Sequence, residues 1–299
     1  MSKSQQTIFI TGATTGIGRA AALYLARAGH RVIASGRNER ALGTLRDEAK
    51  GLALDVVRLD VTDPRSIAAA VETVAQQTGG RGVDVLINNA GYGLAAALAE
   101  VTDEDLRAQF ETNVFGLMSV TRAFLPQMMQ RRSGRILNVS SIGGRVTFPL
   151  FGAYHASKYA VEAMSDALRG ELRPFGIDVV LIEPGPIATE FGNRSVQEVA
   201  KYRRADSPYA AVYAQAEAIK ELSEKQAVPA DRVSKVLLRA IVARRPAARY
   251  VVPFSSRIML WFLRTLPTRW ADGLMRAALG LSPRKLALAA PSAQPRAAA

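Results

Sequence analysis

Short apolar runs alternate with longer amphipathic stretches along most of the chain. The short runs are rich in Val and Ile and are bounded by turn residues, which is typical of strands buried on both faces of a sheet. Six strands are predicted in this way, at residues 7–11, 31–35, 55–59, 83–87, 135–139 and 178–182. A seventh strand is predicted at residues 249–252.

The stretches between these runs carry apolar residues at helical spacing. They predict helices at residues 17–28, 39–49, 66–76, 104–129 and 156–173. Neighbouring parallel strands need crossover connections, and right-handed crossovers through helices place helices on both faces of the sheet. The pattern therefore predicts an α/β fold of the doubly wound (Rossmann) type, with a mostly parallel, seven-stranded sheet. We expect residues 1–253 to form this domain.

Two segments depart from the alternation of strands and helices. Residues 190–227 look helical but interrupted, and they follow the sixth predicted strand, where an open α/β sheet binds its ligand. We expect this excursion to be a substrate lid. Residues 254–286 predict an amphipathic helical extension, and the Ala- and Pro-rich residues 287–299 predict a disordered tail.

The residue composition excludes several kinds of chemistry. The 299 residues contain no cysteine and two histidines, His30 and His155. Disulfides, a thiolate metal site and a cysteine nucleophile are therefore excluded, and we expect no metal site. The apolar runs are too short to span a bilayer, and the N-terminus lacks the apolar stretch of a secretory signal, so we expect a cytoplasmic protein.

Positive charge is concentrated toward the C-terminal end. The net charge is +13, and residues 240–299 contribute +9 of it through ten Lys/Arg and one acidic residue, Asp272. The rest of the chain carries too little charge for a nucleic-acid-binding surface, so no nucleic-acid partner is expected. Trp261 and Trp270 lie among arginines there, which suits peripheral contact with a membrane surface. Three alternatives stay open: the segment is a solvated, arginine-rich tail, it packs over the substrate, or it packs against a partner subunit.

A glycine-rich turn follows the first predicted strand and opens the first predicted helix. Its glycines let the backbone turn tightly and approach a phosphate without a Cβ atom. The N–H groups and positive dipole end of the following helix then face the pyrophosphate of a dinucleotide. The candidate cofactor residues of this turn are Gly12, Thr14, Thr15, Gly16, Ile17 and Gly18.

The end of the second predicted strand indicates which nicotinamide cofactor is used. Sites specific for NAD place a carboxylate here, where it binds the 2′-hydroxyl of the adenosine ribose. This chain has Gly36 in that place, followed by Arg37, whose guanidinium is able to pair with a 2′-phosphate. The sequence therefore predicts NADP(H) rather than NAD(H).

Tyr154 and Lys158 form the candidate catalytic pair. Their spacing of four residues places them on one face of a helix. An unperturbed phenol is a poor base at neutral pH, and a nearby ammonium favours the phenolate, so we expect Lys158 to lower the pKa of Tyr154. Ser141 ends the fifth predicted strand, and its hydroxyl is able to hydrogen-bond a substrate oxygen.

These motifs occur together in an order and spacing that resemble the short-chain dehydrogenase/reductase family. The resemblance rests on Gly12-x3-Gly16-Ile17-Gly18, Asp60-Val61, Asn88-Asn89-Ala90-Gly91, Asn113, Ser141, Tyr154-x3-Lys158 and Pro184-Gly185-Pro186. It implies that Tyr154 is the catalytic acid/base and that Lys158 binds the nicotinamide ribose. It also implies that Ser141 orients the substrate carbonyl and that Asn113 holds a water molecule of a proton relay.

The resemblance further implies cofactor contacts beyond the glycine-rich turn and Arg37. Asp60 and Val61 are expected to contact the adenine. The residues expected to line the rest of the cofactor site are Asn89, Ala90, Gly91, Tyr154, Lys158, Pro184, Gly185, Ile187 and Thr189. Members of the family are commonly oligomeric, so the resemblance also implies a homo-oligomer built on residues 104–129 and 156–173.

The expected function is that of an NADP(H)-dependent oxidoreductase that interconverts a carbonyl group and an alcohol. Apolar residues near the catalytic pair favour a lipophilic small-molecule substrate, with core packing as their alternative role: Leu94, Val146, Phe148, Leu150 and Phe151. The extension resembles that of retinol- and hydroxysteroid-type members. Arg145 has two open roles, binding an acidic substrate group or facing solvent. An imine or enone reductase and a non-catalytic NADPH-sensing protein are the alternative functions.

Overall fold

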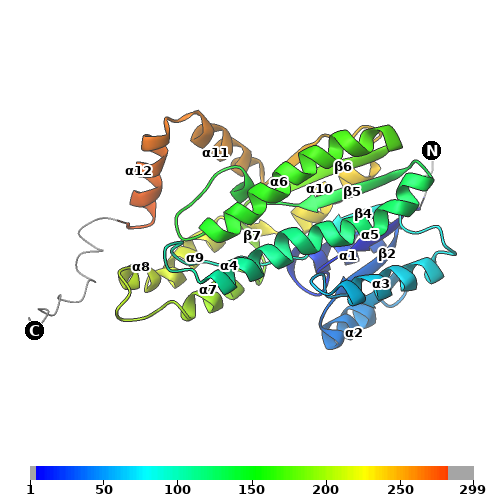
Figure 1. Cartoon of the computed structure of the whole chain (residues 1–299), viewed down its shortest axis with the longest axis horizontal. Coiled ribbons are helices and arrows are strands. Elements are labelled where there is room, and N and C mark those ends of the chain that lie inside the picture. Colours follow the sequence, from blue (N-terminus) through cyan, green and yellow to red (C-terminus); the bar gives the residue numbers. More distant parts are fainter. Residues whose placement is uncertain (1–4, 282–299) are drawn as a thin grey trace, which may run out of the picture.

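The computed structural model describes residues 5–281, apart from the side chains of residues 193–197, 216, 219, 222 and 223. A parallel seven-stranded sheet lies at its centre, in the order β3-β2-β1-β4-β5-β6-β9 (Figure 1). The strands are β1 (Thr7–Ile10), β2 (Arg31–Gly36), β3 (Leu54–Arg58), β4 (Val85–Asn88), β5 (Gly134–Val139), β6 (Ile177–Pro184) and β9 (Arg249–Val252). The seven predicted strands and the doubly wound fold are therefore confirmed.

Helices cover both faces of this sheet. One face carries α1 (Gly16–Arg27), α2 (Glu39–Glu48) and α10 (Asp231–Val242), and the other carries α3 (Pro64–Gln77), α5 (Leu117–Gln130) and α6 (Gly152–Leu172). Successive side chains of a strand point to opposite faces, so Ile8 and Ile10 enter the first core while Phe9 enters the second. Burial on both faces explains why the strands are continuous apolar runs in the sequence.

The helix predicted at residues 104–129 is divided into three parts. α4 (Asp103–Phe110) leads into a π-helical turn at Glu111–Gly116, and α5 follows. Gly116 lies directly against the chain after β3, where an added Cβ atom would be 2.8 Å from the carbonyl oxygen of Val61. Turns of this kind often mark functional sites, and this one contains Asn113.

The segment after β6 consists of helices held between two short strands. β7 (Ile187–Ala188) precedes α7 (Phe191–Ala200), α8 (Ala210–Tyr213) and α9 (Ala216–Lys225), and β8 (Val228–Pro229) follows them. Ile187 pairs with Val228, so the two ends of the excursion lie side by side. The interrupted helical pattern predicted for residues 190–227 is therefore found, whereas the role of a lid stays a prediction.

A hydrogen-bond network fastens this excursion to the loop after β4. The Tyr213 hydroxyl donates to Glu100 Oε2 (2.7 Å) and accepts from the backbone N–H of Ala97 (3.0 Å). The Ser207 hydroxyl donates a further bond to Glu100 (2.7 Å). Because Tyr213 is buried, its phenol makes these bonds away from competing water. We define Glu100, Ser207 and Tyr213 as the latch of this segment.

The C-terminal extension forms two helices, α11 (Phe254–Thr265) and α12 (Thr268–Ala278), at one end of the molecule (Figure 1). Leu260 and Leu263 anchor α11 by packing against Ile142 and Val146 of the loop after β5. The helical extension is therefore confirmed up to residue 278, while the tail predicted at residues 287–299 lies outside the described residues. Within residues 5–281, no helix is both long and apolar enough to cross a membrane.

Removing the Tyr213 hydroxyl tests the latch. In Tyr213→Phe, the Ala97 N–H and the Glu100 carboxylate each lose a buried partner, so we expect the free energy of unfolding to fall by roughly 1–3 kcal/mol in urea denaturation. We also expect faster limited proteolysis within residues 190–227. Tyr209→Phe is the matched control, because its hydroxyl lies outside the latch. Equal proteolysis of the two variants would contradict the latch role.

Candidate active site

The glycine-rich turn is packed against the end of β4 so closely that side chains are excluded. Gly12 has a φ of +65°, and an added Cβ atom would lie 2.7 Å from the Cα of Ala90. A Cβ atom on Gly18 would collide with Gly12 and Asn89. The Asn89 side-chain amide donates to the carbonyls of Thr11 (3.1 Å) and Gly12 (3.0 Å). The predicted cofactor residues of the turn and of β4 are thus brought together.

The N-terminus of α1 faces the same edge of the sheet. Thr15 is its N-cap residue, and among the described residues its side chain caps no N–H group of the helix. Such N–H groups and the helix dipole attract an anion. Thr189, after β7, also reaches this turn, because an added Cβ atom on Gly16 would lie 3.4 Å from the Cβ of Thr189. The sequence-distant residue predicted to meet the cofactor is therefore adjacent to the turn.

The end of β2 carries no carboxylate, and a side chain there would press against Thr14. A Cβ atom on Gly36 would lie 2.7 Å from the Cγ2 of Thr14. Arg37 follows in an exposed position, with its guanidinium 3.7 Å from the carboxylate of Asp60. Burial opposes ionisation of Asp60, but hydrogen bonds from Thr62 and the charge of Arg37 outweigh it and lower the pKa of Asp60. Arg37 and Asp60 thus form one charged site at this corner.

The catalytic pair lies on the first turns of α6. This helix begins at Gly152 rather than at the predicted residue 156, so Tyr154 and Lys158 are both helical and share one face. The Lys158 ammonium lies 5.8 Å from the centre of the Tyr154 ring and donates to the carbonyl oxygen of Val139 (2.9 Å). The Ser141 hydroxyl hydrogen-bonds the phenol of Tyr154. The three predicted residues therefore meet at the end of β5.

Burial controls the protonation of this pair. It raises the pKa of Tyr154 to about 12, and the hydrogen bond of Ser141 offsets part of that rise. It lowers the pKa of Lys158 to about 8, against the opposing charge of Glu162. The expected lowering of the Tyr154 pKa is therefore not found in the protein alone, where desolvation of the phenolate sets the direction of the shift. The phenol is protonated at neutral pH.

Asn113 is held at the centre of the site by the π-helical turn. Its side-chain amide donates to the carbonyl of Tyr92 (3.0 Å) and to the hydroxyl of Ser157 (3.0 Å). Its carbonyl oxygen accepts from the N–H of Tyr92 (3.1 Å). An added Cβ atom on Gly91 would lie 3.0 Å from Asn113 Oδ1 and 3.7 Å from the Lys158 ammonium. The structure thus brings Asn113 close to Lys158, while its role in holding a water molecule stays a prediction.

His155 is a residue of the site that sequence reasoning missed. Its Nδ1 accepts from the N–H of Phe148 (3.1 Å), and a Cβ atom on Gly143 would collide with its ring. It therefore fills the space between α6 and the loop that carries Ser141. Burial lowers the pKa of His155 to about 4. Its position next to Tyr154 in the sequence was the only available signal.

Arg145 has neither of the two roles considered from the sequence. Its guanidinium lies 3.1 Å from the carboxylate of Glu183, which is fully buried at the end of β6. Arg249 of β9 contacts the same carboxylate (3.2 Å) and that of Glu162 on α6 (3.0 Å). Arg145 is thus held in an ion network with Glu183, Arg249 and Glu162, which Arg249 extends to Asp166. It does not offer its charge to a substrate.

The apolar residues proposed for the substrate site are divided between two cores. Leu94, Leu150 and Phe151 pack with Tyr213 beneath the excursion after β6. Val146 and Phe148 pack against α11. Core packing, the alternative role, therefore accounts for most of their contacts. The sequence analysis missed Phe191, whose ring centre lies 5.5 Å from that of Tyr154.

Comparison with known proteins agrees with this geometry. The short chain dehydrogenase family matches residues 6–200. An NADPH-dependent 3-dehydrocapnine reductase of Ornithobacterium rhinotracheale is 33% identical over 88% of this chain and 93% of its own length. A 3-ketodihydrosphingosine reductase of Bacteroides thetaiotaomicron is 35% identical over 92% of this chain and 96% of its own. The crystal structure of an actinorhodin polyketide ketoreductase variant with NADPH has a TM-score of 0.70 and 30% identity, covering 84% of this chain and 97% of that one.

The chain therefore belongs to the short-chain dehydrogenase/reductase family. It is an oxidoreductase of the class that acts on the CH–OH group of donors. The matched range contains the glycine-rich turn, Asn113, Ser141 and the catalytic pair, which are the motifs that carried the resemblance in the sequence.

The pKa of His155 predicts how stability depends on pH. The folded-state pKa of about 4 lies below the ordinary value of 6.5, so between these values the unfolded chain binds a proton that the folded chain does not. The stabilisation is complete above pH 6.5, and about 3 kcal/mol of it is lost as the pH falls to 4. Denaturant unfolding of the wild type and of His155→Gln at several pH values measures this. Parallel pH profiles for the two proteins would rule out the assignment.

Proposed function

We propose that the protein is an NADP(H)-dependent reductase that interconverts a ketone or aldehyde and an alcohol on a lipophilic substrate. The observation that carries this proposal is the meeting of two groups of residues at one edge of the sheet. Ser141, Tyr154 and Lys158 lie at the end of β5, and the glycine-rich turn lies at the end of β1. Open α/β sheets bind their ligands at this edge.

The residues of this edge fit NADP(H). The turn, which has no side chain at Gly12, and the N-terminus of α1 suit the pyrophosphate. Arg37 suits the 2′-phosphate, because Gly36 stands in place of the carboxylate that would repel it. The Lys158 ammonium lies next to Gly91, where an added Cβ atom would be 3.7 Å from it. This position suits binding of the nicotinamide ribose. When bound, NADPH supplies the hydride.

Tyr154 is the proton donor in the reductive direction. Its raised pKa keeps the phenol protonated, and the Ser141 hydroxyl beside it provides a second donor for the substrate oxygen. After the proton leaves, the buried ammonium of Lys158 stabilises the phenolate that remains. Asn113 is proposed to hold the water through which Tyr154 and Lys158 recover a proton. The protein itself therefore supplies both the proton and the charge that stabilises the phenolate, so the substrate needs no charged group.

A lipophilic substrate is supported by the surroundings of Tyr154. The ring centre of Phe191 lies 5.5 Å from that of Tyr154. The His155 ring lies equally close to Tyr154, and Phe151 stacks on it. Arg145 is paired with Glu183 and therefore does not select an acidic substrate. The two reductases named above, of 3-dehydrocapnine and of 3-ketodihydrosphingosine, support a keto substrate for this chain. Residues 190–227 are proposed to close over the substrate as a lid, because Phe191 begins α7.

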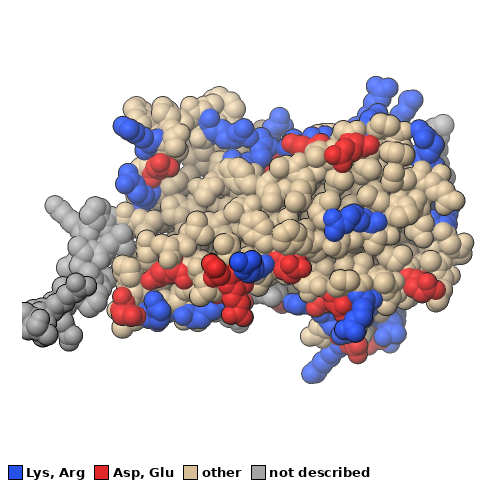
Figure 2. Space-filling model, viewed as in Figure 1, with Lys and Arg blue, Asp and Glu red and all other residues tan. Residues whose placement is uncertain are grey.

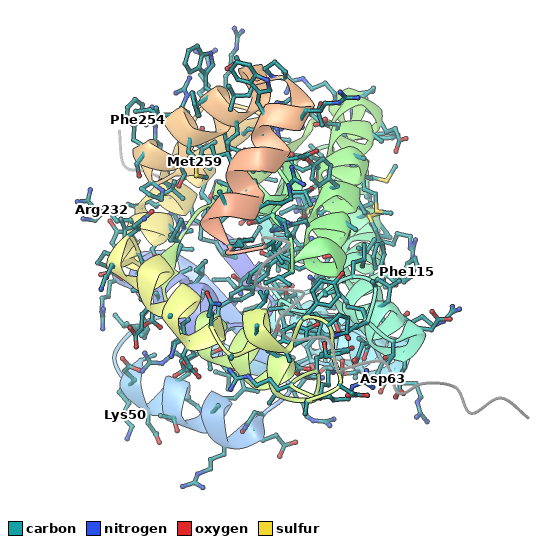
Figure 3. All side chains as sticks on the ribbon, turned by 90° about the vertical axis from the view of Figure 1, so that its left-hand side faces the viewer. Lys50, Asp63, Phe115, Arg232, Phe254 and Met259 are labelled. Atoms are coloured by element: carbon teal, nitrogen blue, oxygen red, sulfur yellow. The ribbon has the colours of Figure 1, made fainter. Side chains whose placement is uncertain are left out.

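Two macromolecular contacts are part of the proposal. A homo-oligomer is proposed to form on α5, α6 and the π-helical turn between α4 and α5. Phe115 of this turn (Figure 3) and Tyr159 of α6 expose large aromatic rings there. Peripheral contact of the C-terminal extension with a membrane is proposed for an otherwise cytoplasmic protein. The exposed aromatic residues of α11 and α12 support it.

Replacing Tyr154 with Phe tests the catalytic assignment. Loss of the proton donor is expected to lower kcat by roughly 100- to 10,000-fold with NADPH and a panel of long-chain, aromatic, retinoid and steroid ketones and aldehydes. The Kd of NADPH should stay nearly unchanged in fluorescence titration. Tyr24→Phe, near the C-terminal end of α1, is the control and should keep full activity. Turnover in Tyr154→Phe equal to that of the wild type would overturn the assignment.

Tight NADPH binding with no turnover of ketones, imines or enones by the wild type would favour the sensing role.

Replacing Arg37 with Ser tests the choice of cofactor. The variant loses the cation proposed to pair with the 2′-phosphate, so the Kd of NADPH should rise roughly 10- to 100-fold while that of NADH changes little. Arg65→Ser removes an exposed arginine that also lies beside an aspartate, and it serves as the matched control. An unchanged ratio of NADPH to NADH affinity in Arg37→Ser would rule out this role.

A further inference from the structure

α11 is apolar on two opposite faces. Its inner face packs Leu260 and Leu263 against the loop after β5. Its outer face exposes Phe254, Ile258, Trp261 and Phe262, which recur at the spacing of one helical stripe. Trp261 is 69% exposed, although a surface helix normally turns polar residues to solvent.

α12 also exposes large apolar side chains. Trp270 is 71% exposed, and Leu274 lies one turn further along the same face. Clusters of exposed large apolar residues mark binding surfaces for other molecules. We define the docking face as the exposed large apolar residues of the two helices together with their arginines: Arg257, Phe254, Ile258, Trp261, Phe262, Arg264, Arg269, Trp270, Leu274 and Arg276.

The charge of the docking face selects its occupant. Residues 254–281 contain four arginines and one acidic residue, Asp272. The arginines come in two pairs with the spacing of two helical turns, Arg257 with Arg264 and Arg269 with Arg276. In Figure 2 the corner formed by α11 and α12 shows mostly basic groups, with some acidic surface between them, beside uncharged surface. An anionic lipid headgroup layer complements this arrangement, with tryptophans at the level of the headgroups.

A second copy of the chain fits the docking face poorly. A two-fold contact places one patch against the same patch, so it would bring eight arginines and two aspartates into one interface. The repulsion between like charges in a shared apolar contact opposes such a dimer. An anionic bilayer neutralises the same charges and takes up the apolar side chains.

The helix that carries part of the docking face also supports the loop of the catalytic serine. Ile142 directly follows Ser141 and packs against the inner face of α11. Ser256 of α11 lies against Gly185, after β6, so closely that a Cβ atom there would collide with it. Figure 3 views this end of the molecule, where Phe254 of α11 points outward. One pair of helices therefore borders both solvent and the active site.

We propose that α11 and α12 dock the enzyme on an anionic lipid bilayer, and that a membrane-dissolved ketone enters the active site beside them. The source of the substrate rests on the proposed reductase function, whereas docking itself does not. Docking shortens the path of a lipophilic ketone, because the ketone passes from the bilayer to the site without crossing water.

Co-sedimentation of the full chain with lipid vesicles tests docking without any assay of activity. Vesicles of phosphatidylcholine alone are compared with vesicles containing about a third phosphatidylglycerol, at low and high salt. We expect binding to the anionic vesicles and its loss at high salt. The double variant Arg257→Gln/Arg264→Gln should bind roughly 10- to 30-fold more weakly. Arg65→Gln/Arg81→Gln removes two exposed arginines elsewhere and should bind like the wild type.

The apolar part of the face is tested by Trp261→Gln/Trp270→Gln. Both tryptophans are exposed, so the variant should keep the wild-type melting temperature and the wild-type rate on a short, water-soluble ketone. Its binding to anionic vesicles and its rate on a long-chain ketone dissolved in them should both fall about tenfold or more. Vesicle binding equal to that of the wild type in both double variants would overturn docking. Loss of self-association in the tryptophan variant, with vesicle binding intact, would assign the face to a second copy instead. Absence of turnover on every ketone, with docking intact, would instead contradict the reductase function.

Discussion

The transfer of the Tyr154 phenol and the Lys158 ammonium out of water is the constraint on which the site depends. Desolvation favours the neutral form of each group, so it raises the pKa of the tyrosine and lowers that of the lysine. The fold compensates for the desolvation of the lysine, because the Lys158 ammonium donates a hydrogen bond to the Val139 carbonyl and the carboxylate of Glu162 raises the pKa of Lys158. The ammonium is thereby retained close to neutrality. A protonated phenol beside an ammonium is the arrangement that a carbonyl reductase requires.

Glu162 also connects the catalytic helix to the buried ion network behind it. Arg249 joins Glu162 to Glu183, and Arg145 approaches Glu183 from the serine loop. Buried charges are costly to desolvate, so such a network contributes little net stability, but losing one member leaves an unpaired charge. Its effect is therefore positional: it fixes α6, β6, β9 and the loop after Ser141 relative to one another. Sequence reasoning found none of these pairings, since the four residues are far apart along the chain.

The excursion after β6 and the C-terminal extension are both attached near the active site, but by partly different interactions. The excursion after β6 is held by polar contacts, with Glu100 accepting from Ser207 and Tyr213. It is also held by apolar packing, because Val199 and Tyr213 are buried against Leu94 and its neighbours in the loop after β4. The extension is attached by apolar packing of Leu260 and Leu263 on the serine loop. Such packing resists separation, so α11 is expected to stay in place while its opposite face is exposed.

The sequence by itself determined the sheet, its helices and the residues that define the family. Strands buried on both faces must be continuous apolar runs, and glycines and the Tyr-x3-Lys spacing act through local geometry that a sequence pattern records. Tertiary structure decided the rest. The π-helical turn at Asn113, the direction of the pKa shift of Tyr154 and the pairing of Arg145 with Glu183 depend on which distant groups meet. Burial and long-range charge pairing are properties of the packed chain, and no local pattern of residues specifies them.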